Sequence, residues 1–120
     1  MSMRIVVAIS LCLAAGHVAA QGNIEAGKQK SLPCSACHGV DGNGTGIPMY
    51  PVIAGQYADY VSKALHEYKS GARSNVIMAG MTSALSEQDI ADLAAYFAAQ
   101  QGPLTELIVT NAEQANAPQQ

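Results

Sequence analysis

The chain has 120 residues, with six Lys and Arg against nine Asp and Glu, which gives a formal net charge of −3. A chain of this length is expected to form one small domain. The mildly acidic balance argues against nucleic acid and anionic membrane surfaces as partners, although it says little about which protein partner is used.

Residues 1–20 have the organisation of a secretory signal peptide. Arg4 supplies a positive start, residues 5–15 form an apolar core, and residues 18–20 form a small-residue cleavage site. The apolar stretch is short for a membrane-spanning helix. We therefore expect cleavage after Ala20 and export to the periplasm, with an uncleaved signal that anchors the chain as the alternative.

The first helix is predicted over residues 23–31, with Asn23 as its N-cap and Pro33 ending it. Glycines and prolines exclude a long regular element from residues 39–55, which we predict to be a loop.

The clearest predicted helix spans residues 56–70, because its apolar residues recur at helical spacing and form one stripe. His66 projects from the opposite, polar face, so we expect it to be solvated rather than a ligand of a buried group. Residues 71–85 are predicted to be a loop that contains Met78 and Met81.

The last helix is predicted to begin after Ser86, a good N-cap, and to end at Gly102 and Pro103. Asp89 stands three residues after Ser86, where a capping box would have Glu or Gln. The expected buried stripe comprises Ile90, Leu93, Ala94 and Phe97, with Tyr96 beside it. Residues 103–120 form a polar tail that we expect to be largely disordered.

The chemistry is predicted by Cys34, Cys37 and His38, which have the spacing of the covalent attachment motif for c-type haem. Two thiols at this spacing can add to the two vinyl groups of the porphyrin, and the following imidazole can then bond the iron. A disulfide, a redox dithiol and a zinc site are the alternatives. An exported chain could close the two cysteines into a disulfide. The histidine directly after Cys37 and the small size of the mature domain favour haem instead, because a prosthetic group adds apolar core.

The sixth position of the iron decides the chemistry of such a haem. An open position permits binding of gases or peroxide, whereas a methionine sulfur fills it and favours electron transfer at raised potential. Met78 and Met81 both lie about forty residues after His38. Their spacing does not decide between them.

Four ordered blocks of sequence resemble a class I cytochrome c, in particular a single haem domain of the cytochrome c4 type. They are residues 34–43, 50–56, 78–81 and 85–97. The resemblance implies an all-α fold of three to five helices wrapped around one covalently attached haem c, here over residues 21–102.

The resemblance also implies roles for individual residues. Met78, rather than the runner-up Met81, would be the second axial ligand of the iron, and the Pro51 carbonyl would accept a hydrogen bond from His38. The first and last helices would cross at a glycine, which places Gly27 near Tyr96. In two respects the chain departs from cytochrome c4 proteins, since it has one haem motif instead of two and its tail has no counterpart.

We therefore expect a periplasmic monohaem electron carrier that transfers single electrons between respiratory-chain proteins and has no catalytic residues of its own. Its expected partners are a quinol-oxidising complex, a terminal oxidase or a dehydrogenase, without nucleic acid or stable membrane insertion, and it would be a monomer or weak dimer. The alternative is the cytochrome subunit of an exported dehydrogenase or sulfur-oxidising enzyme, docked through the apolar residues 107–109 of the tail.

Overall fold

The computed structural model describes residues 21–105 and shows that this part of the chain is all-helical. The predicted signal peptide and most of the predicted tail lie outside the described residues. The helices are α1 (Ile24–Lys30), α2 (Leu32–His38), α3 (Ala58–Ser70), α4 (Val76–Thr82) and α5 (Glu87–Ala98). The predicted all-α class is confirmed. No helix within residues 21–105 is long and apolar enough to cross a bilayer.

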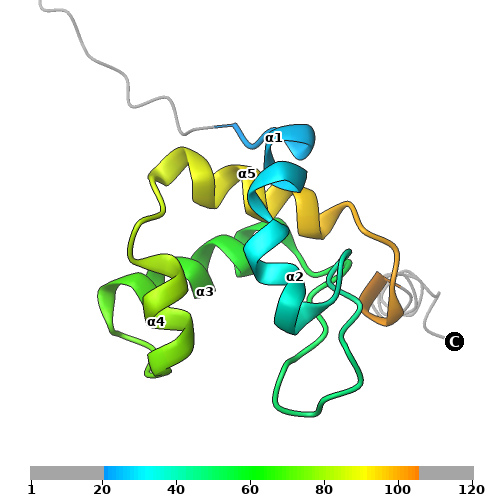
Figure 1. The fold of residues 1–120 in the computed structure, drawn as a ribbon. Coiled ribbons are helices and arrows are strands. Elements are labelled where there is room, and N and C mark those ends of the chain that lie inside the picture. The colour runs from blue at the N-terminus through cyan, green and yellow to red at the C-terminus, as the bar shows by residue number, and fades with distance from the viewer. Residues whose placement is uncertain (1–20, 106–120) are drawn as a thin grey trace, which may run out of the picture.

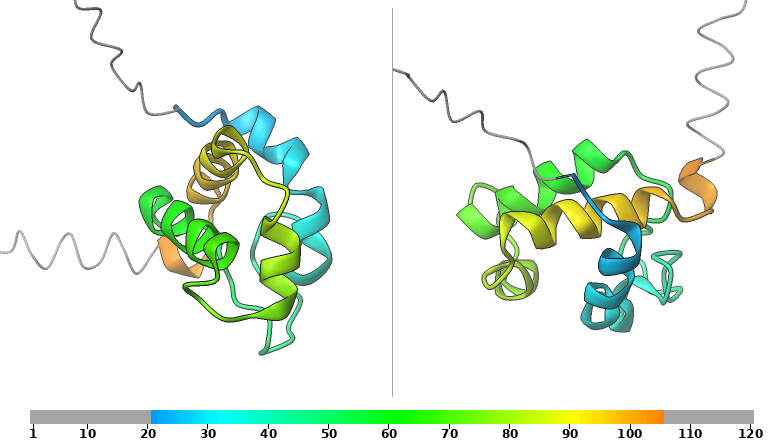
Figure 2. Two further views of the ribbon diagram at one scale, coloured as in Figure 1. Left: turned by 90° about the vertical axis from the view of Figure 1, so that its left-hand side faces the viewer. Right: turned by 90° about the horizontal axis from the view of Figure 1, so that it is seen from above.

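Helix α5 is the centre of the arrangement, because both α1 and α3 pack against it (Figure 1). Helix α4 packs in turn against α3. The two views in Figure 2 place α2 and α4 on the same side of the α3–α5 pair. Residues 39–55, which contain no regular helix, connect α2 to α3 as predicted.

Helices α1, α4 and α5 begin where side chains accept hydrogen bonds from their first backbone N–H groups. Asn23 Oδ1 accepts a hydrogen bond from the N–H of Ala26 at 2.9 Å at the start of α1. At the start of α5, Ser86 and Asp89 form a complete capping box, so an aspartate does here what Glu or Gln usually does.

Two predictions about local structure are wrong. Residues 71–85 are not wholly a loop, because α4 lies within them and carries both Met78 and Met81. Asn75 starts this helix by accepting hydrogen bonds from two backbone N–H groups, and two turns are too short to show a clear apolar period. Pro33 does not end the first helix, since it lies in the first turn of α2, where its missing N–H costs nothing.

The crossing of α1 and α5 depends on Gly27, as the resemblance implied. A Cβ atom built at this position would lie 2.0 Å from the backbone oxygen of Asp92 and 2.7 Å from Cβ of Tyr96. Only glycine therefore lets the two helices approach this closely.

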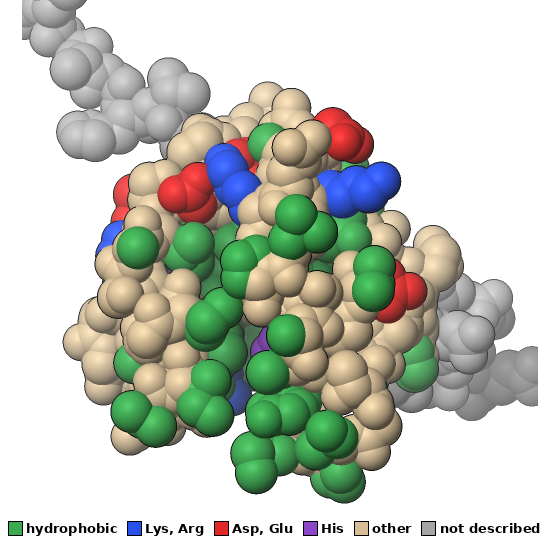
Figure 3. Space-filling view, viewed as in Figure 1, with side chains coloured by type: hydrophobic (Ala, Val, Ile, Leu, Met, Phe, Trp, Pro, Cys, Tyr) green, Lys and Arg blue, Asp and Glu red, His purple; other side chains and the backbone are tan. Residues whose placement is uncertain are grey.

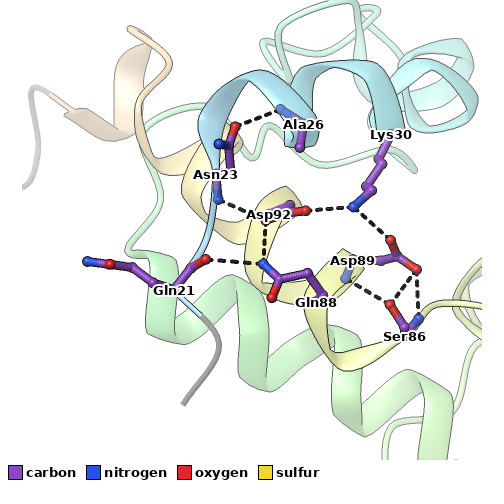
Figure 4. Close-up of polar contacts among 8 residues, drawn as sticks. All are labelled: Gln21, Asn23, Ala26, Lys30, Ser86, Gln88, Asp89 and Asp92. Carbon is purple, nitrogen blue, oxygen red and sulfur yellow. Dashed lines mark hydrogen bonds and ion pairs between the residues drawn. The ribbon is translucent and has the colours of Figure 1, made fainter. Parts of the chain in front are cut away.

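A polar cluster that the sequence did not reveal also fastens α1 to α5 (Figure 4). Asp92 is 2% exposed, and its carboxylate accepts hydrogen bonds from Lys30 Nζ at 2.6 Å and from the N–H of Asn23 at 2.8 Å. Gln88 Nε2 donates a third hydrogen bond at 2.8 Å. Lys30 also pairs with Asp89 at 2.8 Å. The buried carboxylate is thus fully satisfied, as burial of a charge requires.

The hydrophobic core lies beneath this crossing. Leu93, Tyr96 and Phe97 form its buried cluster, and Cys34 from α2 packs against it. The expected stripe on α5 is confirmed, because Ile90 and Ala94 are also buried.

Candidate functional site

Helix α2 presents Cys34 and Cys37 three residues apart, so both thiols lie on one face of the helix. Both cysteines are free and neither is fully exposed. Burial raises the pKa of the Cys34 thiol, which packs beside the core. The helix therefore holds two unbonded sulfurs about one turn apart.

His38, the last residue of α2, is buried with 8% of its surface exposed. Its Nδ1 lies 2.8 Å from the carbonyl oxygen of Pro51. A carbonyl oxygen only accepts hydrogen bonds, so Nδ1 must carry the proton and donate it. This leaves the lone pair of the neutral imidazole on Nε2, the form in which histidine binds a metal.

The loop that brings Pro51 to His38 turns immediately after α2. Gly39 adopts a φ of +83°, and the N–H of Gly44 donates to the His38 carbonyl at 2.7 Å. A side chain at Gly39 would be strained by this φ and would meet the oxygen of Gly44 at 2.6 Å. Glycine at this position therefore permits the reversal that returns the loop to His38.

Helix α4 carries the two candidate methionines. Met78 is half-buried, whereas Met81 is 41% exposed. Thr82, which is 1% exposed, donates its hydroxyl hydrogen to the Met78 carbonyl at 2.9 Å. The backbone of Met78 is therefore held by a buried neighbour on its own helix.

His66 lies on the polar face of α3, as predicted, but it is not simply solvated. Its side chain is 44% exposed, with Nε2 at 2.6 Å from Glu87 Oε2 and Nδ1 at 2.8 Å from the carbonyl of Ser62. Both nitrogens are thus engaged by protein groups, and no pattern along α3 could have shown a partner at the start of α5.

Hydrophobic side chains border a groove on the face shown in Figure 3, over α4 on one side and over α2 and its following loop on the other, with a histidine visible inside it. A hollow of about 320 Å³ lies on the loop, lined by residues between 43 and 52. The large apolar side chains that remain exposed on α2, its following loop and α4 include Leu32, Val40, Ile47, Met49, Val76, Ile77 and Met81. Exposure on this scale is typical of a domain that binds another apolar group.

The residues present fit a haem attached through two thioethers. Two free thiols on one helix face, an imidazole with its lone pair on Nε2, a methionine thioether on α4 and apolar walls are the groups that such a cofactor requires. A zinc site is less well supported, because residues 21–105 contain no group of three or more His, Cys, Asp or Glu side chains placed to hold a metal.

Comparison with known proteins points the same way. The family model described as "Cytochrome c" matches residues 24–101. Cytochrome c4 of Pseudomonas aeruginosa is 46% identical over 85 residues, which cover 71% of this chain and 42% of that protein. Cytochrome c-554(548) of Halomonas halodenitrificans is 41% identical over 83 residues, which cover 67% of this chain and 99% of that protein.

A solved structure shares the fold. The reduced recombinant cytochrome c4 from Pseudomonas stutzeri superposes with a TM-score of 0.64 at 43% identity, over 68% of this chain and 47% of that one. The chain spans about half the length of the cytochrome c4 relatives it matches.

Proposed function

The chain belongs to the cytochrome c family and carries covalently bound haem c, and from this premise we propose that it is a periplasmic monohaem carrier of single electrons between respiratory-chain proteins. The observation that carries the proposal is the hydrogen bond from His38 Nδ1 to the Pro51 carbonyl. Because Nδ1 carries the proton, the lone pair on Nε2 is free to bind a metal.

Each residue of the site has a separate part in this proposal. Cys34 and Cys37 tether the haem to α2, and His38 bonds the iron through Nε2. The Pro51 carbonyl fixes the orientation and tautomer of the imidazole and raises its basicity. Met78 supplies the thioether sulfur on the other side, and its half-buried position supports it over the more exposed Met81.

The haem iron supplies the one-electron couple when it is bound. If His38 and Met78 held the iron in both oxidation states, the site would be closed to gases and peroxide and would be suited to electron transfer. We propose no acid, base or nucleophile role for any side chain.

Substitution of the methionines tests the ligand assignment. Oxidised protein should show the weak long-wavelength absorption of a methionine–ferric bond, and Met78→Ala should abolish it while Met81→Ala retains it. Loss of the band in Met81→Ala alone would transfer the role to Met81 and contradict the assignment.

Export is tested separately. Cell fractionation should find the haem-loaded chain in the periplasm, with its N-terminus at Gln21 by mass spectrometry. A chain that is retained in the membrane with residues 1–20 intact would show that the signal serves as an anchor.

Purification from the native host separates the carrier from the alternative function, a cytochrome subunit of an exported dehydrogenase or sulfur-oxidising enzyme. A free carrier should elute as a small monomer or dimer. Co-elution with a catalytic subunit in fixed stoichiometry would favour the subunit role.

A further inference from the structure

The short connection between α4 and α5, residues 83–86, is fastened to α3 by polar contacts on both sides of Ser86. Lys69 Nζ donates to the carbonyl of Leu85, and His66 Nε2 lies 2.6 Å from Glu87 Oε2. Leu85 itself packs against the core. Helix α3 therefore holds the point at which α4 ends and α5 begins (Figure 1).

The hydrogen bonds of His66 show which protons this contact needs. Nδ1 lies 2.8 Å from the carbonyl of Ser62, so Nδ1 must donate. The ionised carboxylate of Glu87 also only accepts, so Nε2 must donate as well. Both contacts of His66 are therefore satisfied only when the imidazole is doubly protonated. Loss of one proton removes the ion pair with Glu87 and sets a lone pair against either the Glu87 carboxylate or the Ser62 carbonyl.

The surroundings of His66 favour this protonated form. The hydrogen bond to Glu87 is the main cause that raises the pKa of His66, and the Ser62 carbonyl adds to it. Burial and the positive charge of Lys69 on α3 lower the pKa of His66, but by less than these two hydrogen bonds raise it. Helix α4 contributes no titratable side chain, and the pKa of Glu87 on α5 is lowered by His66. Because the folded-state pKa of His66 is raised, the contact is present below the ordinary histidine pKa and is lost as pH rises through the raised value.

The same connection follows α4 directly in the chain. Four residues separate Thr82, at the end of α4, from Glu87. Thr82 is almost fully buried and donates a hydrogen bond to the Met78 carbonyl, so the end of α4 next to the connection is bonded to the backbone of the methionine. At its other end, α4 is held by the Asn75 cap.

We propose that His66 and Glu87 are positioning residues that hold α4 so that Met78 can bond the haem iron. The inference rests on the proposed role of Met78. Protonation of a surface histidine would then adjust the strength of the methionine–iron bond through the connection between α4 and α5, without contact between His66 and Met78.

Azide binding to the ferric holoprotein measures this coupling, because azide must displace the methionine and remains an anion throughout the range used. From about pH 6 to about pH 9, the wild-type affinity for azide should rise about two- to fivefold, as expected for loss of an exposed ion pair. In Glu87→Gln the amide can donate to neutral His66, so the affinity should stay near the low value at both pH values. In Glu87→Ala the affinity for azide should be close to the high value at both pH values.

Glu67→Gln is the matched control, because it removes the same charge from a pair with Lys63 that lies wholly within α3. It should keep the wild-type pH dependence. The inference would be overturned if the azide affinity of Glu87→Gln depended on pH as strongly as that of the wild type. It would also be overturned if Glu67→Gln lost the pH dependence. A wild-type protein with no methionine–ferric band at any pH would instead refute the role of Met78, and the inference with it.

Amide hydrogen exchange gives a second readout that does not involve the iron. Exchange across residues 76–86 should be faster in Glu87→Ala than in Glu67→Gln, because only the first frees the connection. Equal exchange in the two variants would count against the inference even if both fold normally.

Discussion

Replacement of Gly27 by alanine tests how strongly the fold depends on the close crossing of α1 and α5. The added Cβ would lie 2.0 Å from the Asp92 backbone oxygen, whereas real Cβ atoms essentially never come within 3.0 Å of such an atom. The obstacle is backbone, which cannot rotate away as a side chain can. The two helices must therefore separate by about 1 Å.

The cost of this separation can be set against the intrinsic preference of alanine for helices. Overpacking of a close interface costs about 1–3 kcal/mol, and a gap of this size forfeits about a quarter to a half of the dispersion energy of each contact that is pulled apart. Alanine returns about 0.5–1 kcal/mol relative to glycine inside a helix. We therefore expect Gly27→Ala to lower the free energy of unfolding by about 2 kcal/mol, close to the upper end of the clash minus the propensity gain.

Urea unfolding of the holoprotein measures the effect, and Gly80→Ala is the control. Gly80 also lies inside a helix, α4, but a Cβ there meets nothing within 4 Å. It is two residues from Met78, about 200° around the helix, and so points away from it. Gly80→Ala should stabilise the protein by about 0.5–1 kcal/mol. If both variants shifted stability in the same direction, the argument from close approach at Gly27 would be refuted.

Three further predictions follow from the capping, the buried carboxylate and the attachment motif. Ser86→Ala should cost about 1 kcal/mol in urea unfolding. Ser86→Thr should restore the stability, since Thr also caps a helix and can donate its hydroxyl hydrogen to Asp89 as Ser86 does. An unchanged stability of Ser86→Ala would contradict a stabilising role for the capping box. Lys30 holds the pKa of Asp92 below its ordinary value, so the free energy of unfolding should fall as pH drops below about 4. Lys30→Gln should flatten that fall in acid titrations, and an unchanged slope would contradict this. Replacement of both Cys34 and Cys37 by serine should make the haem extractable by acidified acetone, and retention of the colour on the chain would contradict covalent attachment through these residues.

Local pattern was enough to predict the features whose causes lie within a few residues. The attachment motif places Cys34, Cys37 and His38 at positions i, i+3 and i+4 of one helix, so they share a face without help from any distant residue. The N-cap at Asn23 is likewise confirmed, because capping depends on the chain within one turn. The buried stripe of α5 could be read from its period.

Features that depend on residues far apart in the chain could not be read in this way. Helix α4 is two turns long and gains its place from the Asn75 cap and from packing on α3, which no apolar period of its length reveals. Asp92 looks like any polar residue of a helix until α1 brings Lys30 to it from 62 residues away. The pairing of His66 with Glu87 spans 21 residues and two helices.

The sequence by itself therefore predicted the chemistry of the cofactor attachment, since two thiols followed by an imidazole at this spacing match the motif for covalent haem. The tertiary structure decided how that chemistry is held. It brings the carbonyl of Pro51 to His38 and lets α1 cross α5 at Gly27. It also packs the helix that carries Met78 against α3. The physical reason is that covalent spacing acts along the chain, whereas hydrogen bonds and close packing act between segments that only the fold brings together.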